Sequence, residues 1–195
     1  MDRETELRLV ERLRDGDEAA FDAVYDAYRA RLFGFLVRLS RRRDVAEDLL
    51  EETWLRLVAR ARALAPDTRL LAWLFTVARN LYWSYCRSRL LDEDRMAALA
   101  RLWPLADRRP SPFEETAGSE MARRIERALA GLSRTDRETL LLVAVEGLEP
   151  AEAAAVCGVS AEALRQRLSR ARARLAAALE AGERRPAGEP HEVLT

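Results

Sequence analysis

Two groups of charged residues in this 195-residue chain have the spacing of binding surfaces. The first lies in residues 44–58, where the acids recur at intervals of three and four and therefore share one face of a helix. This acidic stripe consists of Asp44, Glu47, Asp48 and Glu51. It is either a solvated helix face or a docking face for a basic partner.

The second group is an arginine-rich stretch, residues 164–175, that contains no acid. On a helix, its apolar residues would face a core, and the opposite face would carry Glu162, Gln166, Ser169 and Arg170. Gln166 and Arg170 could read base edges in a DNA groove. Arginines on the two flanks, Arg165 with Arg172 and Arg167 with Arg174, suit phosphates. Arg167 and Arg174 could instead pair with neighbouring acids and hold the fold.

A third stretch, residues 69–89, interleaves aromatic residues with arginines. Arginines follow phosphates and aromatic rings accept base faces, so the pattern suits unpaired nucleic acid. For Trp73 we favour core packing. For the aromatics further along, core packing and base stacking remain open.

The composition argues against an enzyme. The sequence has no Gly-rich phosphate loop, no metal-ligand cluster and no nucleophile–base pair, so we predict no catalytic site, metal or cofactor. Cys86 and Cys157 are too far apart to suggest a disulfide framework, and His191 is the only histidine.

No apolar run approaches the roughly 20 residues of a membrane span, and the charged N-terminus lacks a signal peptide. We therefore expect a cytoplasmic protein without a membrane span.

Hydrophobic periodicity predicts an all-α fold with two small helical domains. Helices are expected at 4–14, 17–40 (as one long helix or two), 44–63 and 69–89, with Gly16 ending the first and Asp17 capping the second. A short helix around 92–102 is a further option. Later, a short helix at 150–156, a turn with Gly158 and a long helix capped by Ser160 form a helix-turn-helix signature. The domains are predicted at 1–90 and 119–181, with a Pro-containing linker at 91–118 and a disordered tail at 182–195.

These motifs together resemble the extracytoplasmic-function (ECF) class of the sigma-70 superfamily, which serves bacterial RNA polymerase. Residues 44–57 look like the core-binding helix of region 2, and residues 72–81 look like its promoter-melting helix. Residues 146–160, followed by 164–172, resemble region 4. The resemblance covers about residues 19–179, and the motifs are highly specific when taken jointly.

The resemblance implies a sigma factor that binds core RNA polymerase and directs transcription initiation at promoter DNA. The acidic stripe matches the face that docks on the clamp helices of the largest polymerase subunit, and region 4 would meet the flap region. An anti-sigma factor is a further partner that members of the family often have. Contacts with the −10 element are expected from Arg69, Asn80, Trp83, Ser84 and Arg87. Contacts with the −35 element are expected from Glu162, Arg165, Gln166, Arg167, Ser169 and Arg170.

Two departures from the family pattern leave the promoter sequence open. Ser84 stands where the family often has Asp, and Glu162-Ala163 stands where it often has Gly-Thr. Glu162 could repel a phosphate or accept a hydrogen bond from a cytosine amino group.

The alternative hypothesis is a stand-alone helix-turn-helix regulator with a helical dimerisation or sensor domain. It would need neither the acidic stripe nor the aromatic stretch at 69–89, and it should bind duplex DNA as a dimer without polymerase.

Overall fold

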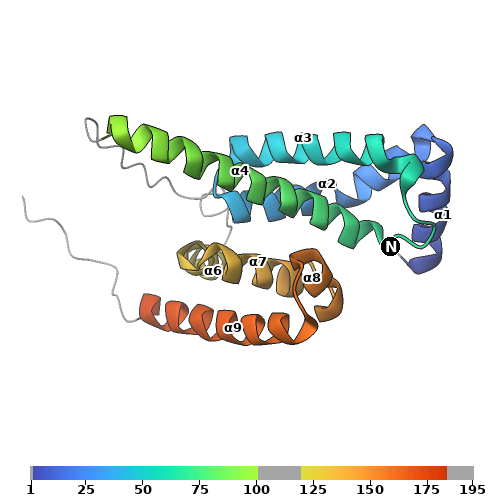
Figure 1. The fold of residues 1–195 in the computed structure, drawn as a ribbon. Coiled ribbons are helices and arrows are strands. Elements are labelled where there is room, and N and C mark those ends of the chain that lie inside the picture. Colours follow the sequence, from blue (N-terminus) through green and yellow to red (C-terminus); the bar gives the residue numbers. More distant parts are fainter. Residues whose placement is uncertain (1, 101–119, 184–195) are drawn as a thin grey trace, which may run out of the picture.

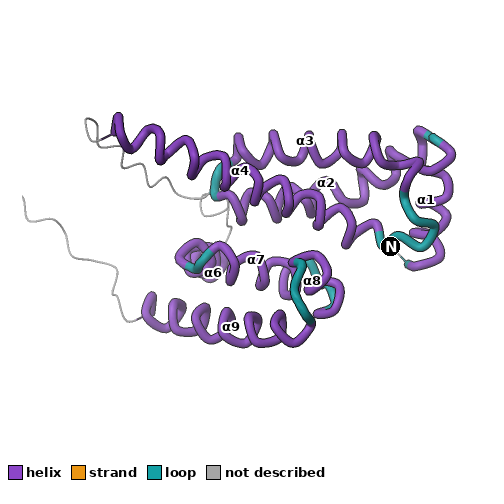
Figure 2. The backbone as a smooth tube through the Cα atoms, viewed as in Figure 1, coloured by secondary structure: helices purple, strands orange, loops and turns teal. Residues whose placement is uncertain are grey.

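The described part of the chain, residues 2–100 and 120–183 of a computed structural model, is built from helices and turns (Figure 1). Figure 2 shows helices joined by short loops, with no strand among the described residues. This confirms the all-α prediction. Of the helices in these two ranges, none is both long and apolar enough to cross a membrane.

The N-terminal unit contains five helical segments. They are α1 (Arg3–Asp15), α2 (Glu18–Ser40), α3 (Arg43–Arg60), the 3₁₀ turn η1 (Ala61–Ala63) and α4 (Leu70–Ala100). The predicted end of α1 and the predicted start of α2 are both confirmed. Gly16 has a φ of +82°, and Asp17 accepts hydrogen bonds from the Ala19 and Ala20 N–H groups. Such a cap stabilises a helix by about 1 kcal/mol.

Helices α2, α3 and α4 pack side by side, and α1 crosses one end of this bundle (Figure 1). Apolar side chains at helical spacing fill the space between them. Phe35 of α2 meets Phe75 of α4 edge to face, with ring centroids 5.1 Å apart. Both rings are fully buried, together with Leu57 of α3. Trp73 is half-buried against the same core, as expected for core packing.

Helix α4 continues to Ala100 as a single element, where the sequence suggested a helix to residue 89 and a second short helix. The reason is local. Residues 90–100 contain neither Gly nor Pro and consist mostly of strong helix formers. The rest of the predicted linker and most of the predicted tail lie outside the described residues, so the division of the chain into domains stays a prediction.

The C-terminal unit carries the predicted helix-turn-helix. Its elements are α6 (Glu120–Gly131), α7 (Arg134–Leu140), the π-helical turn η2 (Leu141–Val145), α8 (Pro150–Cys157) and α9 (Ala161–Glu183). Gly158, with a φ of +66°, ends α8 in a left-handed turn. Ser160 then caps α9 by accepting a hydrogen bond from the Ala163 N–H at 3.1 Å. The short helix, the glycine turn and the capped long helix are all confirmed.

The predicted inner face of α9 is buried. Leu164, Leu168 and Ala171 pack against the rest of the C-terminal unit. The unit lies along the α2–α4 bundle, with α7 and α8 nearer the bundle and α9 on the far side (Figure 1). The outer face of α9 therefore points away from the N-terminal unit.

Candidate nucleic-acid and protein interfaces

The acidic stripe lies on the exposed side of α3, as its spacing predicts. Asp44 is paired with Arg42, whose hydrogen bond holds the pKa of that carboxyl below its ordinary value. Glu47 is paired with Arg43 at 2.9 Å. Arg42 and Arg43, at the start of the helix, thus offset part of the acidic repulsion, which the stripe itself could not do. Across residues 2–89 and 120–183, no cation lies within ion-pair distance of Asp48 or Glu51.

The stripe continues as an apolar surface. Leu55 and Val58 follow Glu51 at helical spacing, and they are 56 % and 59 % exposed. They form the wall of an open groove of about 320 Å³ between α2 and α3. This apolar groove is lined by Phe21, Tyr25, Glu47, Leu50, Glu51, Trp54, Leu55 and Val58.

The groove was not anticipated from the sequence. The floor is an aromatic cluster in which the Tyr25 and Trp54 rings lie 4.9 Å apart. The buried Trp54 Nε1 has no hydrogen-bond partner in the described structure. Extending the three-and-four spacing of the acids along α3 would have reached Leu55 and Val58. The exposed face of α3 is therefore acidic at its start and apolar at its end.

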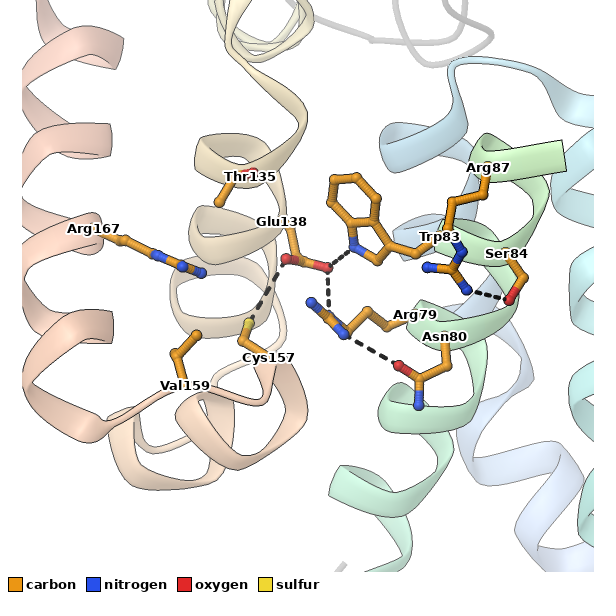
Figure 3. Close-up of a pocket in the computed structure, with 10 residues that line it drawn as sticks. All are labelled: Arg79, Asn80, Trp83, Ser84, Arg87, Thr135, Glu138, Cys157, Val159 and Arg167. Atoms are coloured by element: carbon orange, nitrogen blue, oxygen red, sulfur yellow. Dashed lines mark hydrogen bonds and ion pairs between the residues drawn. The ribbon is translucent and has the colours of Figure 1, made fainter. Parts of the chain in front are cut away.

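Four of the five residues expected to contact the −10 element share one face of α4. Asn80, Trp83, Ser84 and Arg87 line a polar pocket of about 380 Å³ between the two units (Figure 3). Arg87 donates to the Ser84 hydroxyl at 2.9 Å. Arg69 lies apart from this pocket, just before α4, where it pairs with Glu152 at 2.8 Å and with Glu6 at 3.4 Å.

Glu138 closes this pocket from the C-terminal unit, and sequence reasoning missed it. Its side chain is 1 % exposed. One carboxylate oxygen accepts from Arg79 Nε at 2.9 Å and from Trp83 Nε1 at 2.7 Å. The other faces the Cys157 thiol at 3.8 Å (Figure 3). The signal was available, because Glu138 precedes Leu141 and Leu142 at the same three-and-four spacing and so shares their buried face.

The outer face of α9 carries most of the residues expected to contact the −35 element. Glu162 pairs with Arg165 at 3.0 Å and accepts from the Gln166 amide at 3.2 Å. Glu162 therefore fixes the positions of two neighbouring side chains on its own helix. Ser169 and Arg170 are exposed beside them.

The flanking arginines of α9 have different surroundings. Arg167 lines the polar pocket between the units, on the same side as Glu138 (Figure 3). It therefore lies with residues expected at the −10 element. Arg174 is paired with Asp136 of α7, which is the structural role left open from the sequence.

The described residues hold no group of His, Cys, Asp and Glu side chains arranged for a metal ion. Cys86 and Cys157 are both free and buried. Burial raises the pKa of the Cys157 thiol to about 12, with a further contribution from the Glu138 carboxylate. A thiol of this kind is a poor nucleophile at neutral pH.

Comparison with known proteins assigns both units to a family. Residues 24–90 match the family model of sigma-70 region 2, and residues 122–175 match that of sigma-70 region 4. The chain is 35 % identical over 174 residues to the ECF RNA polymerase sigma factor EcfG of Rhodopseudomonas palustris, covering 89 % of this chain and 88 % of that one. It is 32 % identical to the RNA polymerase sigma factor CarQ of Myxococcus xanthus, covering 83 % and 90 %.

A solved structure is similar as well. It is the sigma factor RpoE in complex with the anti-sigma factor NepR from Bartonella quintana. The TM-score is 0.65 at 29 % sequence identity, and the match covers 84 % of this chain and 96 % of that one. With both regions matched in order along the chain, this protein belongs to the sigma-70 family of RNA polymerase sigma factors, in its ECF class.

Proposed function

We propose that the chain is an ECF sigma factor that binds core RNA polymerase in the cytoplasm and directs it to promoters. It supplies binding surfaces and makes or breaks no covalent bond. The observation that carries the proposal is the presence, on one chain, of a partly unpaired acidic and apolar face on α3 together with two separate faces suited to DNA.

The face of α3 is proposed to dock on the clamp helices of the largest polymerase subunit. Asp48 and Glu51 have no cation beside them among residues 2–89 and 120–183, so a basic partner would pair with their charges. The adjacent apolar groove offers Leu55 and Val58, which lose contact with water on docking. An interface with an apolar centre and a charged rim is the usual arrangement for specific protein partners. Region 4 is proposed to meet the flap region of the polymerase.

The face of α4 is proposed to open the −10 element and hold an unpaired base. The Trp83 ring can stack on a base, and stacking contributes about 1–3 kcal/mol per base in single-strand complexes. The Asn80 amide offers both a donor and an acceptor to a base edge. Ser84 and Arg87 lie on the same face and suit the phosphates beside that base. Arg69 would contact DNA before α4.

The outer face of α9 is proposed to enter the major groove at the −35 element. Arg170 and Gln166 can each make two hydrogen bonds to a base edge, and Ser169 can add one. Arg165 is positioned for a phosphate, whereas Arg167 lies in the pocket between the two units. The Glu162 carboxylate holds the Arg165 and Gln166 side chains in place, so we assign it a positioning role on the helix.

A regulator consisting of a helix-turn-helix and a dimerisation domain is less well supported. Such a protein would have no use for the exposed groove on α3 or for the DNA-facing residues of α4. A protein inhibitor fits the proposed function, because the related RpoE structure is a complex with the anti-sigma factor NepR.

Promoter opening by the reconstituted holoenzyme tests the proposal. Core polymerase with the wild-type chain should make thymines near −10 reactive to permanganate on a promoter selected from genomic fragments. Asn80→Ala should reduce that reactivity at least about tenfold, which corresponds to 1.4 kcal/mol of lost contact. The matched control is Ser88→Ala, an exposed residue two turns further along α4. Equal opening by wild type and Asn80→Ala would refute the role of α4.

A further inference from the structure

The polar pocket between α4 and the C-terminal unit presents two arginines without an acidic partner (Figure 3). Arg87 of α4 is exposed and donates to the neighbouring Ser84 hydroxyl at 2.9 Å. Arg167 of α9 is half-buried and reaches into the pocket from the opposite side. Among residues 2–89 and 120–183, no carboxylate lies within ion-pair distance of either guanidinium. The proposed DNA contacts leave Arg167 without a role.

The one carboxylate among the lining residues of this pocket is already paired. Glu138 is 1 % exposed, and it accepts from Arg79 at 2.9 Å and from the Trp83 indole at 2.7 Å. Three arginines and one glutamate line the pocket, so its formal net charge is +2. Arg79 offsets Glu138, and the surplus comes from Arg87 and Arg167. Like charges gathered in one recess repel each other, and an anion between them would replace that repulsion by attraction.

The uncharged polar residues of the pocket add hydrogen-bond donors. Arg79 donates to the Asn80 Oδ1 at 3.1 Å, which leaves the Asn80 N–H groups as donors. The Ser84 hydroxyl accepts from Arg87, so its own O–H can donate elsewhere. Thr135 of α7 brings a second hydroxyl from the C-terminal unit (Figure 3). Guanidinium groups and donors on both sides suit the oxygens of a phosphate, which accept several hydrogen bonds.

The volume and the aromatic wall of the pocket define the size and shape of its ligand. Small-molecule sites measure about 300–1,000 Å³, so the 380 Å³ of this pocket accommodates a small molecule rather than a bare ion. The half-buried Trp83 ring lines the pocket, and the bond from its N–H to Glu138 fixes the orientation of the ring. Flat rings stack on indole faces. A phosphorylated ligand with a flat ring, which is the chemistry of a mononucleotide, matches these features.

We propose that this pocket binds a free mononucleotide, with the phosphate between Arg87 and Arg167 and the base against the Trp83 ring. A DNA strand offers the same groups, but the proposed −10 contacts around this pocket come from α4 alone. The free nucleotide needs both units, because Arg167 belongs to α9. Nucleotide and −10 strand would compete for α4, and this consequence rests on the proposed function, whereas the binding of the nucleotide does not.

Isothermal titration of the full-length chain, without DNA, tests the site. The probes are the ribonucleoside 5′-monophosphates, and the tightest binder is compared with its nucleoside and with inorganic phosphate. Each of these two fragments makes part of the contacts and should bind at least about tenfold more weakly than the nucleotide. Arg87→Gln and Arg167→Gln should each weaken nucleotide binding at least about tenfold, because each removes charge-assisted hydrogen bonds.

Two further variants separate the pocket from general charge effects and from misfolding. Arg172→Gln removes the same charge from an exposed position of α9 outside the pocket, and it should bind the nucleotide like the wild type. Thr135→Val keeps every charge and removes one hydroxyl, so it should weaken binding about three- to tenfold. Circular dichroism of each variant reports that the helices are retained.

Three results would overturn the site. It fails if every nucleotide has a dissociation constant above about 1 mM, or if inorganic phosphate binds as tightly as the nucleotide. It also fails if Arg172→Gln weakens binding as much as Arg167→Gln does. Promoter opening by the holoenzyme is a separate readout, in which Arg167→Gln should match the wild type because α4 is unchanged. Failure of the nucleotide site would therefore leave the proposed −10 role of α4 standing.

Discussion

The contact between Glu138 and Arg79 should be a strong coupling between the two units. Glu138 is 1 % exposed and Arg79 19 %, so both charges are largely removed from water. A hydrogen bond to a charged group contributes about 1.5–3 kcal/mol, and one between neutral groups about 0.5–1.5 kcal/mol. Glu138→Gln keeps the shape and an acceptor for Trp83 but removes the charge. We therefore expect this substitution to lower the free energy of unfolding by about 1–2 kcal/mol.

A double-mutant cycle isolates the pair. Glu138→Gln, Arg79→Gln and the double variant are compared by urea denaturation, and residues in direct contact are expected to couple by about 0.5–3 kcal/mol. The control cycle uses Glu120 and Arg127, an exposed pair within α6 at 2.8 Å. Pairs of that kind are worth about 0–1 kcal/mol. Additive effects at Glu138 and Arg79, with no coupling beyond that of the control, would refute the reasoning that a buried ion pair joins the units.

Three further predictions concern base reading, pH and thiol reactivity. Arg170→Ala should relax base preference at the −35 element by about 1–3 kcal/mol per lost contact. Arg165→Ala should weaken binding to all DNA sequences alike. Affinities of the two variants for a panel of duplexes distinguish these two effects. Burial raises the pKa of the Glu146 carboxyl above its ordinary value of 4.5. The native chain therefore binds the proton more tightly than the unfolded chain does. The free energy of unfolding then falls as pH rises from 4.5 through the raised pKa. Glu146→Gln should therefore flatten the profile of Tm against pH, and an unchanged slope would contradict this. Cys157, with its pKa raised to about 12, should resist alkylation at neutral pH. Glu138→Gln should raise the rate of alkylation of Cys157, followed by mass spectrometry. An equal rate in the wild type and the variant would count against the contact between Glu138 and Cys157.

Local signals in the sequence were sufficient for most of the helices. Gly16, Asp17, Gly158 and Ser160 act through hydrogen bonds and backbone angles within a few residues, so their roles follow from residue type alone. The inner face of α9 followed from helical spacing in the same way. The end of α4 was less predictable, because no cap or breaker marks residue 90 and the helix simply continues.

The candidate site was predictable where a single helix defines it. The acids of α3 and the outer residues of α9 each share a face by spacing, and the structure places them there. Contacts between distant segments were not predictable in this way. Glu138 meets Arg79 and Trp83 across 59 and 55 residues of chain, and only the packing of the two units brings them together. For the same reason Arg167, which a helix-only view places at the −35 element, lies in the pocket between the units.

The surface of α3 shows a different limit of sequence reasoning. The acids were recognised, but Leu55 and Val58 belong to the same stripe and were not expected to be exposed. Apolar residues on a helix are usually assigned to a core, since most of them are buried there. Here the outer face of α3 carries apolar residues as well, which fits a surface that is covered by a partner.

Affinity for core RNA polymerase decides whether the acidic and apolar face of α3 is a docking surface. The assay is a fluorescence titration of labelled chain with core enzyme, comparing wild type with Asp48→Arg/Glu51→Arg. A control with the same change in net charge, Glu11→Arg/Glu180→Arg, alters exposed acids on α1 and α9. An exposed ion pair is worth about 0.2–1 kcal/mol and reversal replaces attraction by repulsion, so two reversals should cost roughly 1–4 kcal/mol. The wild type and the control should bind core polymerase, and the α3 variant should bind at least about fivefold more weakly. Equal affinity of all three chains for core polymerase would contradict it.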